Sequence, residues 1–267
     1  MTAMPRMTTN APVLLEERDR GVLRLTLNRP EARNALSAAL MSALLETLAG
    51  AATDPQARVV VIAGAGPAFC AGHDLREMRA DQRRETYERL FAECSELMLA
   101  IVRLPKPVIA EVHGVATAAG CQLVATCDLA VAAEDARFAT PGVNIGLFCS
   151  TPMVALTRAV GRKAAMEMLL TGKLIDARTA QAIGLVNSVV PRVGLREAVD
   201  GLAREIAGKS ALTVKIGKEA FYRQAEFDLA AAYRYAAEVM TTNMLARDAG
   251  EGIDAFLAKR EPVWHDR

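Results

Sequence analysis

The stretch Pro107–Ala132, PVIAEVHGVATAAGCQLVATCDLAVA, contains the pattern that decides the fold. The apolar runs Val108–Val112 and Leu129–Ala133 each predict a buried strand. Between them, small residues follow Gly114 and lead into a predicted helix over Ala119–Cys127. A strand, a tight turn, a helix and another strand in such a short stretch are typical of an α/β protein with parallel strands.

The same alternation extends on both sides of this stretch. Sequence patterns predict further strands over 13–17, 22–27 and 58–63, and helices over 37–52 and 84–104. Later in the chain, helical periodicity predicts helices over 193–207, 211–223, 227–243 and 247–258. We therefore expect a flexible N-terminus over 1–12, an α/β core over 13–192, and a helical region over 193–267 that belongs to the same structural unit.

The composition excludes several classes of protein. Hydrophobic residues make up 52% of the 267 residues and charged residues 24%, which excludes a disordered chain. The formal net charge of +1 gives no overall attraction for nucleic acid or anionic lipid. Because aromatic residues make up only 4% of the chain, stacking platforms for single-stranded nucleic acid are not expected.

The cysteines, the histidines and the N-terminus indicate the redox state of the thiols, the need for a metal or cofactor, and the cellular location. Five cysteines without a C-x-x-C pair predict reduced, mostly buried thiols: Cys70, Cys94, Cys121, Cys127 and Cys149. With three histidines and no H-E-x-x-H motif, neither a metal site nor a permanently bound cofactor is expected. The N-terminus resembles no signal or transit peptide, which predicts a cytoplasmic protein. Residues 138–157 are uncharged, but their Pro, Gly and Asn residues favour a loop that leads into a helix over a membrane span.

The segment Arg58–Phe69, RVVVIAGAGPAF, suggests a nucleotide site as a weak alternative. A strand followed by G-x-G is typical of dinucleotide-binding folds. However, Phe69 occupies the third glycine position, and Pro67 lies where the helix should begin. A tight turn at the strand end is the simpler interpretation.

Two later turns suggest catalysis by the main chain. In Phe69–Leu75 and in His113–Leu123, a strand ends in small residues that lead into a helix. Because the first N–H groups of a helix are unpaired, two such turns could direct two N–H groups at one oxygen, as in an oxyanion hole. The alternative is that the small residues serve only close packing of helix on strand. Asp74 is expected to cap the helix that follows it.

At these motifs the sequence resembles the enoyl-CoA hydratase/isomerase (crotonase) superfamily, and the resemblance extends over about residues 13–260. The matching segments are Asn28–Ser37, Ala68–Leu75, Pro107–Ala132, Arg137–Leu147, Leu156–Gly172 and Gly252–Arg260. The resemblance implies a spiral of ββα units with a C-terminal helical trimerisation region, and trimers that often pair into hexamers. It also implies that the partner is an acyl-CoA thioester, with no nucleic acid or membrane partner.

The resemblance also implies the residues of the site. The main-chain N–H groups of His73 and Ala119 should form the oxyanion hole on the thioester carbonyl. The positions that should contact coenzyme A are Arg29, Ala32, Arg33, Ala71, Gly72, Asp74, Phe256 and Lys259. Arg29, Arg33 and Lys259 suit its phosphates, although each could also be a plain solvated charge.

The catalytic carboxylates of the family's hydratases are absent. Hydratases of the family use two glutamates, and the corresponding positions here are Gln122 and Gly142. Since neither can carry a proton near neutral pH, we expect poor hydration, and we expect the pair Gln122→Glu and Gly142→Glu to improve it. The expected function is stabilisation of a thioester oxyanion or enolate. Decarboxylation of an acyl-CoA, thioester hydrolysis and non-catalytic binding of acyl-CoA are the alternatives.

Several side chains could replace the glutamates or could be purely structural. The His73 imidazole and the Cys149 or Cys121 thiol are candidates for chemistry, but a packed ring and inert buried thiols are the simpler interpretations. Asp128 is expected to be a helix cap. Ser150 and Thr151 are expected to cap a helix near Met153.

Overall fold

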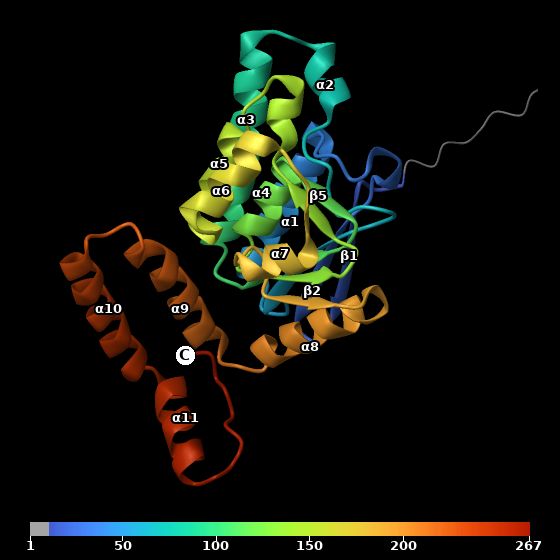
Figure 1. Cartoon of the computed structure of the whole chain (residues 1–267). Coiled ribbons are helices and arrows are strands. Elements are labelled where there is room, and N and C mark those ends of the chain that lie inside the picture. Colours follow the sequence, from blue (N-terminus) through green and yellow to red (C-terminus); the bar gives the residue numbers. More distant parts are fainter. Residues whose placement is uncertain (1–10) are drawn as a thin grey trace, which may run out of the picture.

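The computed structural model describes residues 11–267 and contains two sheets (Figure 1). The main sheet consists of β1 (Leu14–Asp19), β2 (Val22–Leu27), β3 (Val59–Gly64), β4 (Val108–Val112), β6 (Leu129–Ala133) and β9 (Ser188–Val190), in the order β1-β2-β3-β4-β6-β9. β1 is antiparallel to β2, and the other neighbours are parallel. Of the N-terminus predicted to be flexible over 1–12, residues 1–10 lie outside the described part.

A smaller second sheet connects consecutive turns of the chain. It contains β5 (Val115–Thr117), β7 (Arg137–Ala139) and β8 (Ile175–Asp176). Single bridges join Cys70 to Ala116 and Leu36 to His73, and these bridges bring earlier segments to the same side of the molecule. Successive turns therefore add a strand to the main sheet and a short strand or a single bridge beside it, which confirms the predicted ββα spiral.

The core lies on both faces of the main sheet, because successive side chains of a strand point to opposite faces. On β3, Val60 and Ile62 belong to the large cluster formed with α1 (Ala38–Thr53) and α3 (Arg84–Arg103). Val59 and Val61 belong to a second cluster formed with α8 (Leu195–Ala207). The predicted strands and long helices of this region are confirmed, and Ser37 caps α1 by accepting a hydrogen bond from the Leu40 N–H at 3.2 Å.

The remaining helices complete the core and form the C-terminal region. They are α2 (Leu75–Ala80), α4 (Ala119–Thr126), α5 (Ser150–Ala159), α6 (Arg162–Thr171), α7 (Ala177–Ala182), α9 (Ala211–Gln224), α10 (Leu229–Met244) and α11 (Arg247–Leu257). Three short 3₁₀ turns are η1 (Pro30–Ala32), η2 (Pro141–Ile145) and η3 (Arg192–Gly194). Helices α9–α11 extend away from the body of the molecule (Figure 1), and the helical C-terminal region predicted from the sequence is confirmed.

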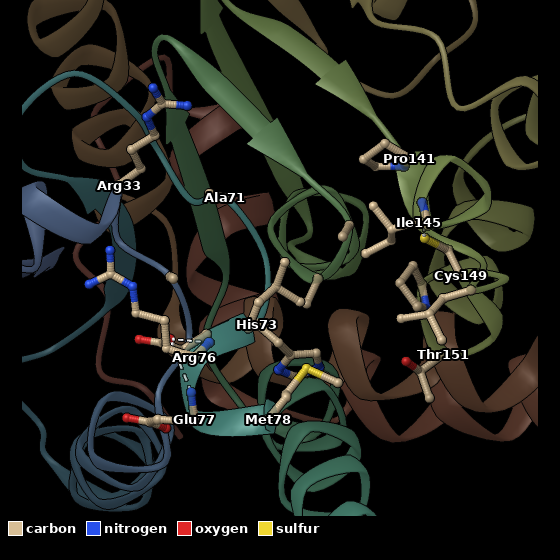
Figure 2. Close-up of a pocket in the computed structure, with 18 of the residues that line it drawn as sticks. Arg33, Ala71, His73, Arg76, Glu77, Met78, Pro141, Ile145, Cys149 and Thr151 are labelled. Atoms are coloured by element: carbon tan, nitrogen blue, oxygen red, sulfur yellow. Dashed lines mark hydrogen bonds between the residues drawn. The ribbon is translucent and has the colours of Figure 1, made fainter. Parts of the chain in front are cut away.

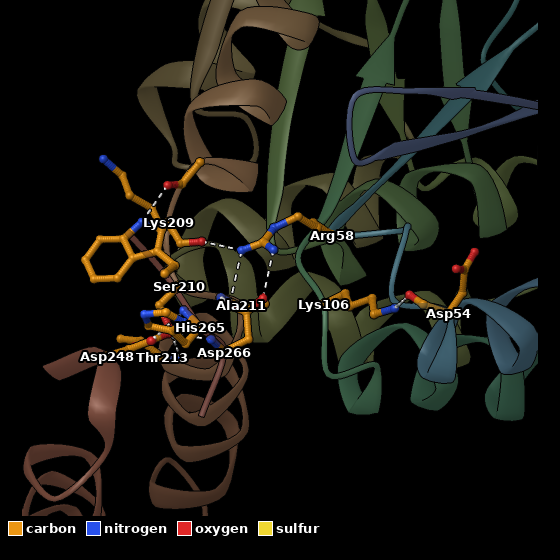
Figure 3. Close-up of polar contacts among 12 residues, drawn as sticks. Asp54, Arg58, Lys106, Lys209, Ser210, Ala211, Thr213, Asp248, His265 and Asp266 are labelled. Carbon is orange, nitrogen blue, oxygen red and sulfur yellow. Dashed lines mark hydrogen bonds and ion pairs between the residues drawn. The ribbon is translucent and has the colours of Figure 1, made fainter. Parts of the chain in front are cut away.

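The end of the chain folds back against the start of α9 (Figure 3). Arg58 directly precedes β3 of the α/β core. Its guanidinium pairs with the Asp266 carboxylate at 3.0 Å and donates to the Lys209 carbonyl at 2.6 Å. The buried Asp248 carboxylate accepts hydrogen bonds from the N–H groups of His265 at 2.7 Å and Asp266 at 2.9 Å. These contacts tie α11 and the start of α9 to the edge of the core.

Asp128 and the segment at Ser150 differ from the predictions. Asp128 caps no helix: its carboxylate accepts hydrogen bonds from the Lys218 ammonium at 2.7 Å, the Val108 N–H at 2.7 Å and the Tyr222 hydroxyl at 2.8 Å. It therefore joins α9 to the core. α5 begins at Ser150 itself, so Ser150 is inside the helix and not its cap.

The five cysteines are buried and free, as predicted. Within residues 11–267, no group of three or more His, Cys, Asp and Glu side chains is placed to hold a metal ion. None of the helices in the same range is both long and apolar enough to cross a membrane.

Candidate active site

A cavity of about 870 Å³ lies between η1, α2, the start of α4 and the segment from η2 to α5 (Figure 2). This volume suits a small-molecule site. Figure 2 shows His73 and Met78 on one wall and Pro141, Ile145 and Cys149 on the other. Of the predicted site residues, the cavity wall contains Arg29, Ala32, Arg33, Ala71, His73, Asp74, Ala119 and Gly142.

The bridge to Leu36 fixes the orientation of the main-chain N–H of His73, a residue of the cavity wall. The Leu36 N–H donates to the Gly72 carbonyl at 2.7 Å, and the Asp74 N–H donates to the Leu36 carbonyl at 3.1 Å. In an extended chain, successive N–H groups point in opposite directions. The N–H of His73 therefore points away from Leu36, and it has no acceptor within the described part of the chain.

The second turn presents the N–H of Ala119, the first residue of α4. Ala118, which precedes it, has a φ of 50° and a ψ of −117°, a conformation that is strained for alanine by about 1–3 kcal/mol. A hydrogen bond from the Ala118 N–H to the Ala139 carbonyl at 2.9 Å holds this conformation. The N–H of Ala119 has no acceptor among residues 11–267 and lies at the positive end of the helix dipole.

Gly72 and Gly120 allow the two turns to approach each other. A Cβ atom on Gly72, whose φ is +97°, would lie 3.4 Å from the Ala119 nitrogen and 2.9 Å from the Ala118 Cβ. A Cβ atom on Gly120 would lie 2.1 Å from the Cys70 carbonyl oxygen. His73 and Ala119, whose N–H groups lack acceptors within residues 11–267, therefore lie on two closely approaching turns of the cavity wall.

The loop around η1 supplies the charged edge of the cavity. The buried Asn34 amide fixes this loop by donating to the carbonyls of Ala65 at 2.8 Å and Ala68 at 2.7 Å. The Arg29 guanidinium is already engaged, because it pairs with Asp74 at 2.9 Å and donates to the Ala35 carbonyl at 2.6 Å. The predicted role of Arg29 as a phosphate ligand therefore changes to positioning of the loop.

Asp74 caps α2 as predicted, by accepting hydrogen bonds from the N–H groups of Arg76 at 3.0 Å and Glu77 at 3.4 Å. Burial raises the pKa of Asp74, but the hydrogen bonds from Arg29 and from these amides outweigh it and hold the pKa below its usual value. Asp74 is therefore a carboxylate at neutral pH and is committed to structure.

The sequence profile of the enoyl-CoA hydratase/isomerase family matches residues 17–267. The chain belongs to this family. The motifs Gly72–Leu75, Thr117–Ala125 and Phe138–Pro152 predict similarity to enoyl-CoA hydratase domain-containing protein 3, and the comparison confirms it. The Homo sapiens protein of that name is 48% identical over 91% of this chain and 80% of its own length. The 2,3-dehydroadipyl-CoA hydratase of Escherichia coli is 38% identical over 95% of this chain and 99% of its own.

A solved structure titled enoyl-CoA hydratase, from Mycobacterium smegmatis, matches with a TM-score of 0.94 and 57% identity. The match covers 96% of this chain and 100% of the chain in that structure. The comparisons also correct the predicted cytoplasmic location, because the relatives from Xenopus laevis, Rattus norvegicus and Homo sapiens are all named mitochondrial.

At the two positions that the resemblance assigns to catalytic glutamates, the structure leaves no place for an acid–base side chain facing the cavity. Gln122 is buried at 3% exposure and does not line the cavity; its Oε1 faces the Cys94 thiol at 4.0 Å. Gly142 does line the cavity, but a Cβ atom there would lie 2.6 Å from the Leu147 carbonyl oxygen and 2.9 Å from the Cys149 sulfur. The predicted catalytic placement of Gln122 is therefore wrong, and the loop occupies the space of a side chain at Gly142.

Three other predicted ligand contacts are absent from this chain's own cavity. Gly72 does not line it and serves the close approach of the turns instead. Phe256, in α11, is 82% exposed, and neither it nor Lys259 lines the cavity of its own chain. Contact of Phe256 and Lys259 with the ligand of a neighbouring subunit stays a prediction.

Sequence reasoning missed part of the cavity wall. Arg76, in the first turn of α2, is exposed at the charged edge, and neither it nor Arg33 has an ion-pair partner within residues 11–267. The apolar side of the wall includes Met78, Phe91, Ile145, Leu147 and Phe148. The segment Gly72–Leu75 indicated the turn, but only the tertiary structure shows which faces of α2 and α3 meet the cavity.

Proposed function

We propose that this protein binds acyl-CoA thioesters in the cavity and stabilises the oxyanion of an enolate or tetrahedral adduct with the N–H groups of His73 and Ala119. The observation that carries the proposal is the pair of acceptor-free amides on two adjacent turns of the cavity wall. Such fixed donors stabilise charge that develops in a transition state. Membership of the family and the name of the Escherichia coli relative support the ligand class.

The division of the cavity wall supports a coenzyme A thioester as the ligand. Arg33 and Arg76 lie at one edge, where guanidinium groups suit phosphate oxygens. Pro141 and Ile145 lie along the opposite wall, where they suit an acyl chain. The oxyanion donors lie between these two regions, which is the place of the thioester carbonyl.

The proposal favours enolate chemistry over hydration, because no glutamate is available at positions 122 and 142. Butyryl-CoA, crotonyl-CoA and malonyl-CoA should each bind in isothermal titration, and free butyrate should not. Turnover of each thioester is then followed by its ultraviolet absorbance and by mass spectrometry. Failure of all the CoA thioesters to bind would contradict the proposal, and binding without any turnover would leave a non-catalytic binder.

Arg33→Gln should weaken the binding of butyryl-CoA by about 10- to 100-fold, because a charge-assisted hydrogen bond contributes roughly 1.5–3 kcal/mol. The measurement is the dissociation constant from isothermal titration. Arg103→Gln is the matched control, since Arg103 is exposed at the end of α3 and does not line the cavity. An unchanged affinity in Arg33→Gln would remove Arg33 from the binding site.

Restoring both glutamates should fail, contrary to the expectation from sequence. The double variant Gln122→Glu/Gly142→Glu should hydrate crotonyl-CoA no faster than the wild type, and Gly142→Glu alone should lower the free energy of unfolding by about 1–3 kcal/mol. The reason is that position 142 has no room for a Cβ atom. Crotonyl-CoA absorbance and urea unfolding give the two readouts.

The control for this prediction is Gly161→Glu, because Gly161 is exposed and a Cβ atom there meets nothing within 4 Å. Its free energy of unfolding should change by no more than about 0.5 kcal/mol. A rise of about 100-fold or more in hydration by the double variant, the size of a restored acid–base group, would show that the loop opens to admit the new side chains.

A further inference from the structure

The His73 side chain is a buried polar group without a partner. Its residue lines the cavity, and its two ring nitrogens are shielded from solvent and have no hydrogen-bond partner within the described part of the chain. Phe91 packs against the ring edge-on, with 5.8 Å between the ring centroids and 72° between the planes. This contact with Phe91 satisfies neither nitrogen.

Buried polar atoms in folded proteins are nearly always hydrogen-bonded, so an exception requires an explanation. The buried His113 follows the rule, because its Nε2 lies 2.9 Å from the Gly66 carbonyl oxygen. His73 is therefore unlike the buried histidine that serves only structure in this protein. An unpaired imidazole beside a cavity is suited to interaction with a ligand or to proton transfer.

The surroundings keep this imidazole neutral. Burial lowers the pKa of His73 below its ordinary value and outweighs the opposing effect of the Leu36 carbonyl, which lies near the ring without meeting the geometry of a hydrogen bond to it. Burial also raises the pKa of the Cys149 thiol across the cavity, so that thiol stays protonated at neutral pH. The other titratable side chains of the cavity wall are Arg29, Glu31, Arg33, Asp74, Arg76 and Glu77. A neutral imidazole is the form that can accept a proton.

We propose that the His73 imidazole is the proton-transfer group of the site and acts on the α-carbon of the bound acyl-CoA. The inference rests on the proposed acyl-CoA function. In this step the α-carbon–hydrogen bond breaks, its proton moves to a ring nitrogen, and its electron pair moves onto the thioester oxygen as an enolate. The N–H groups of His73 and Ala119 stabilise that oxygen, and the imidazolium then returns the proton to carbon. No other reactant is consumed.

One residue thus supplies both an oxyanion donor and the base. In the proposed complex the main-chain N–H of His73 donates to the thioester oxygen of the substrate. The imidazole belongs to the same residue, so it starts close to the substrate's α-carbon, which is bonded to that carbonyl. The proposal requires a rotation of the ring about its side-chain bonds that brings a nitrogen to the cavity. The unbranched Met78, which also lines the cavity, can adapt its shape to this rotation. The substrate class is therefore an acyl-CoA with a hydrogen on its α-carbon.

The test distinguishes the contribution of the His73 side chain from that of its main-chain N–H. His73→Gln keeps the main-chain N–H and a polar side chain of similar reach, but it cannot accept a proton near neutral pH. The probe is butyryl-CoA in D₂O, with exchange of the α-protons followed by NMR and affinity measured by isothermal titration. We expect exchange to fall by about 100-fold or more and the dissociation constant to stay within about threefold.

His265→Gln is the matched control, because His265 is exposed and lies outside the cavity; it should exchange at the wild-type rate. Wild-type exchange should also decline as the pH falls through the pKa of His73, below about 6.5, and His73→Gln should lack this decline. If His73→Gln does not fold by circular dichroism, His73→Asn replaces it in the same assays.

The outcomes distinguish the two proposals. If the wild type does not bind butyryl-CoA, the proposed function fails. If it binds but does not exchange, or if His73→Gln exchanges at the wild-type rate, the proposed role of the imidazole is wrong while the binding function stands. Loss of exchange with unchanged affinity, together with loss of the pH-dependent decline, supports the inference.

Discussion

Gly120→Ala should lower the free energy of unfolding by about 3 kcal/mol and should reduce turnover of any CoA thioester that the wild type converts by about 100-fold or more. The added methyl group would lie 2.1 Å from the Cys70 carbonyl oxygen, which belongs to the bridge between the two turns. The start of α4 must therefore move away from Cys70. Because Ala119 precedes Gly120, that movement displaces one of the two proposed oxyanion donors.

The control for this substitution is Gly50→Ala in α1, where a Cβ atom meets nothing within 4 Å. Alanine is the better helix former, so this change should raise the free energy of unfolding by about 0.5–1 kcal/mol. Urea unfolding measures both variants, and thioester turnover is measured on the folded fraction. Wild-type stability and turnover in Gly120→Ala would show that the two turns need not approach as closely as the structure places them.

Lys218→Met should lower the free energy of unfolding by about 3 kcal/mol, because it removes the ammonium that pairs with the half-buried Asp128 carboxylate and leaves that charge uncompensated. The Lys218 ammonium also donates to the carbonyls of Ile101 and Lys106, both at 2.9 Å. Burial lowers the pKa of Lys218 and outweighs the opposing effect of Asp128, so the buried ammonium depends on these three partners. Since Lys218 lies in α9, hydrogen exchange should show α9 to be less protected in the variant.

Lys215→Met is the matched control on the same helix, since Lys215 is exposed and lacks an ion pair in the described part of the chain; it should change the free energy of unfolding by no more than about 0.5 kcal/mol. The double variant Lys218→Met/Asp128→Asn should recover part of the lost stability, because it removes the uncompensated charge. Equal stability of Lys218→Met and the wild type would mean that α9 is held to the core by its apolar contacts alone.

The long elements could be predicted because their signals are local. The apolar run of β3 and the periodic apolar positions of α3 need no knowledge of the rest of the chain. The short strands β5, β7 and β8 escaped prediction, since each has only two or three residues and is defined by its partner strand. Local patterns could therefore predict the long strands and helices, and the family resemblance implied their spiral, but no local pattern predicted the short strands of the second sheet.

The features of the site also divide into those that local sequence predicts and those that it does not. The turn at His73 and the start of the helix at Ala119 follow from local sequence, whereas side-chain roles depend on distant partners. Arg29 is engaged by Asp74, and Gln122 turns toward Cys94, so neither is free at the cavity. The lack of room at Gly142 arises from the path of the loop at Leu147 and is invisible in a motif.

Building the proposed oxyanion donors from main-chain amides has a consequence for how this protein can be studied and how it can diverge. Conventional mutagenesis exchanges side chains and leaves both amides in place, so a scan of positions 73 and 119 cannot measure what they contribute. Backbone ester substitution, in which an α-hydroxy acid replaces a residue, removes the N–H alone. For the same reason, evolutionary drift can replace every acidic and basic side chain around the cavity while the main-chain donors to the thioester oxygen are inherited unchanged.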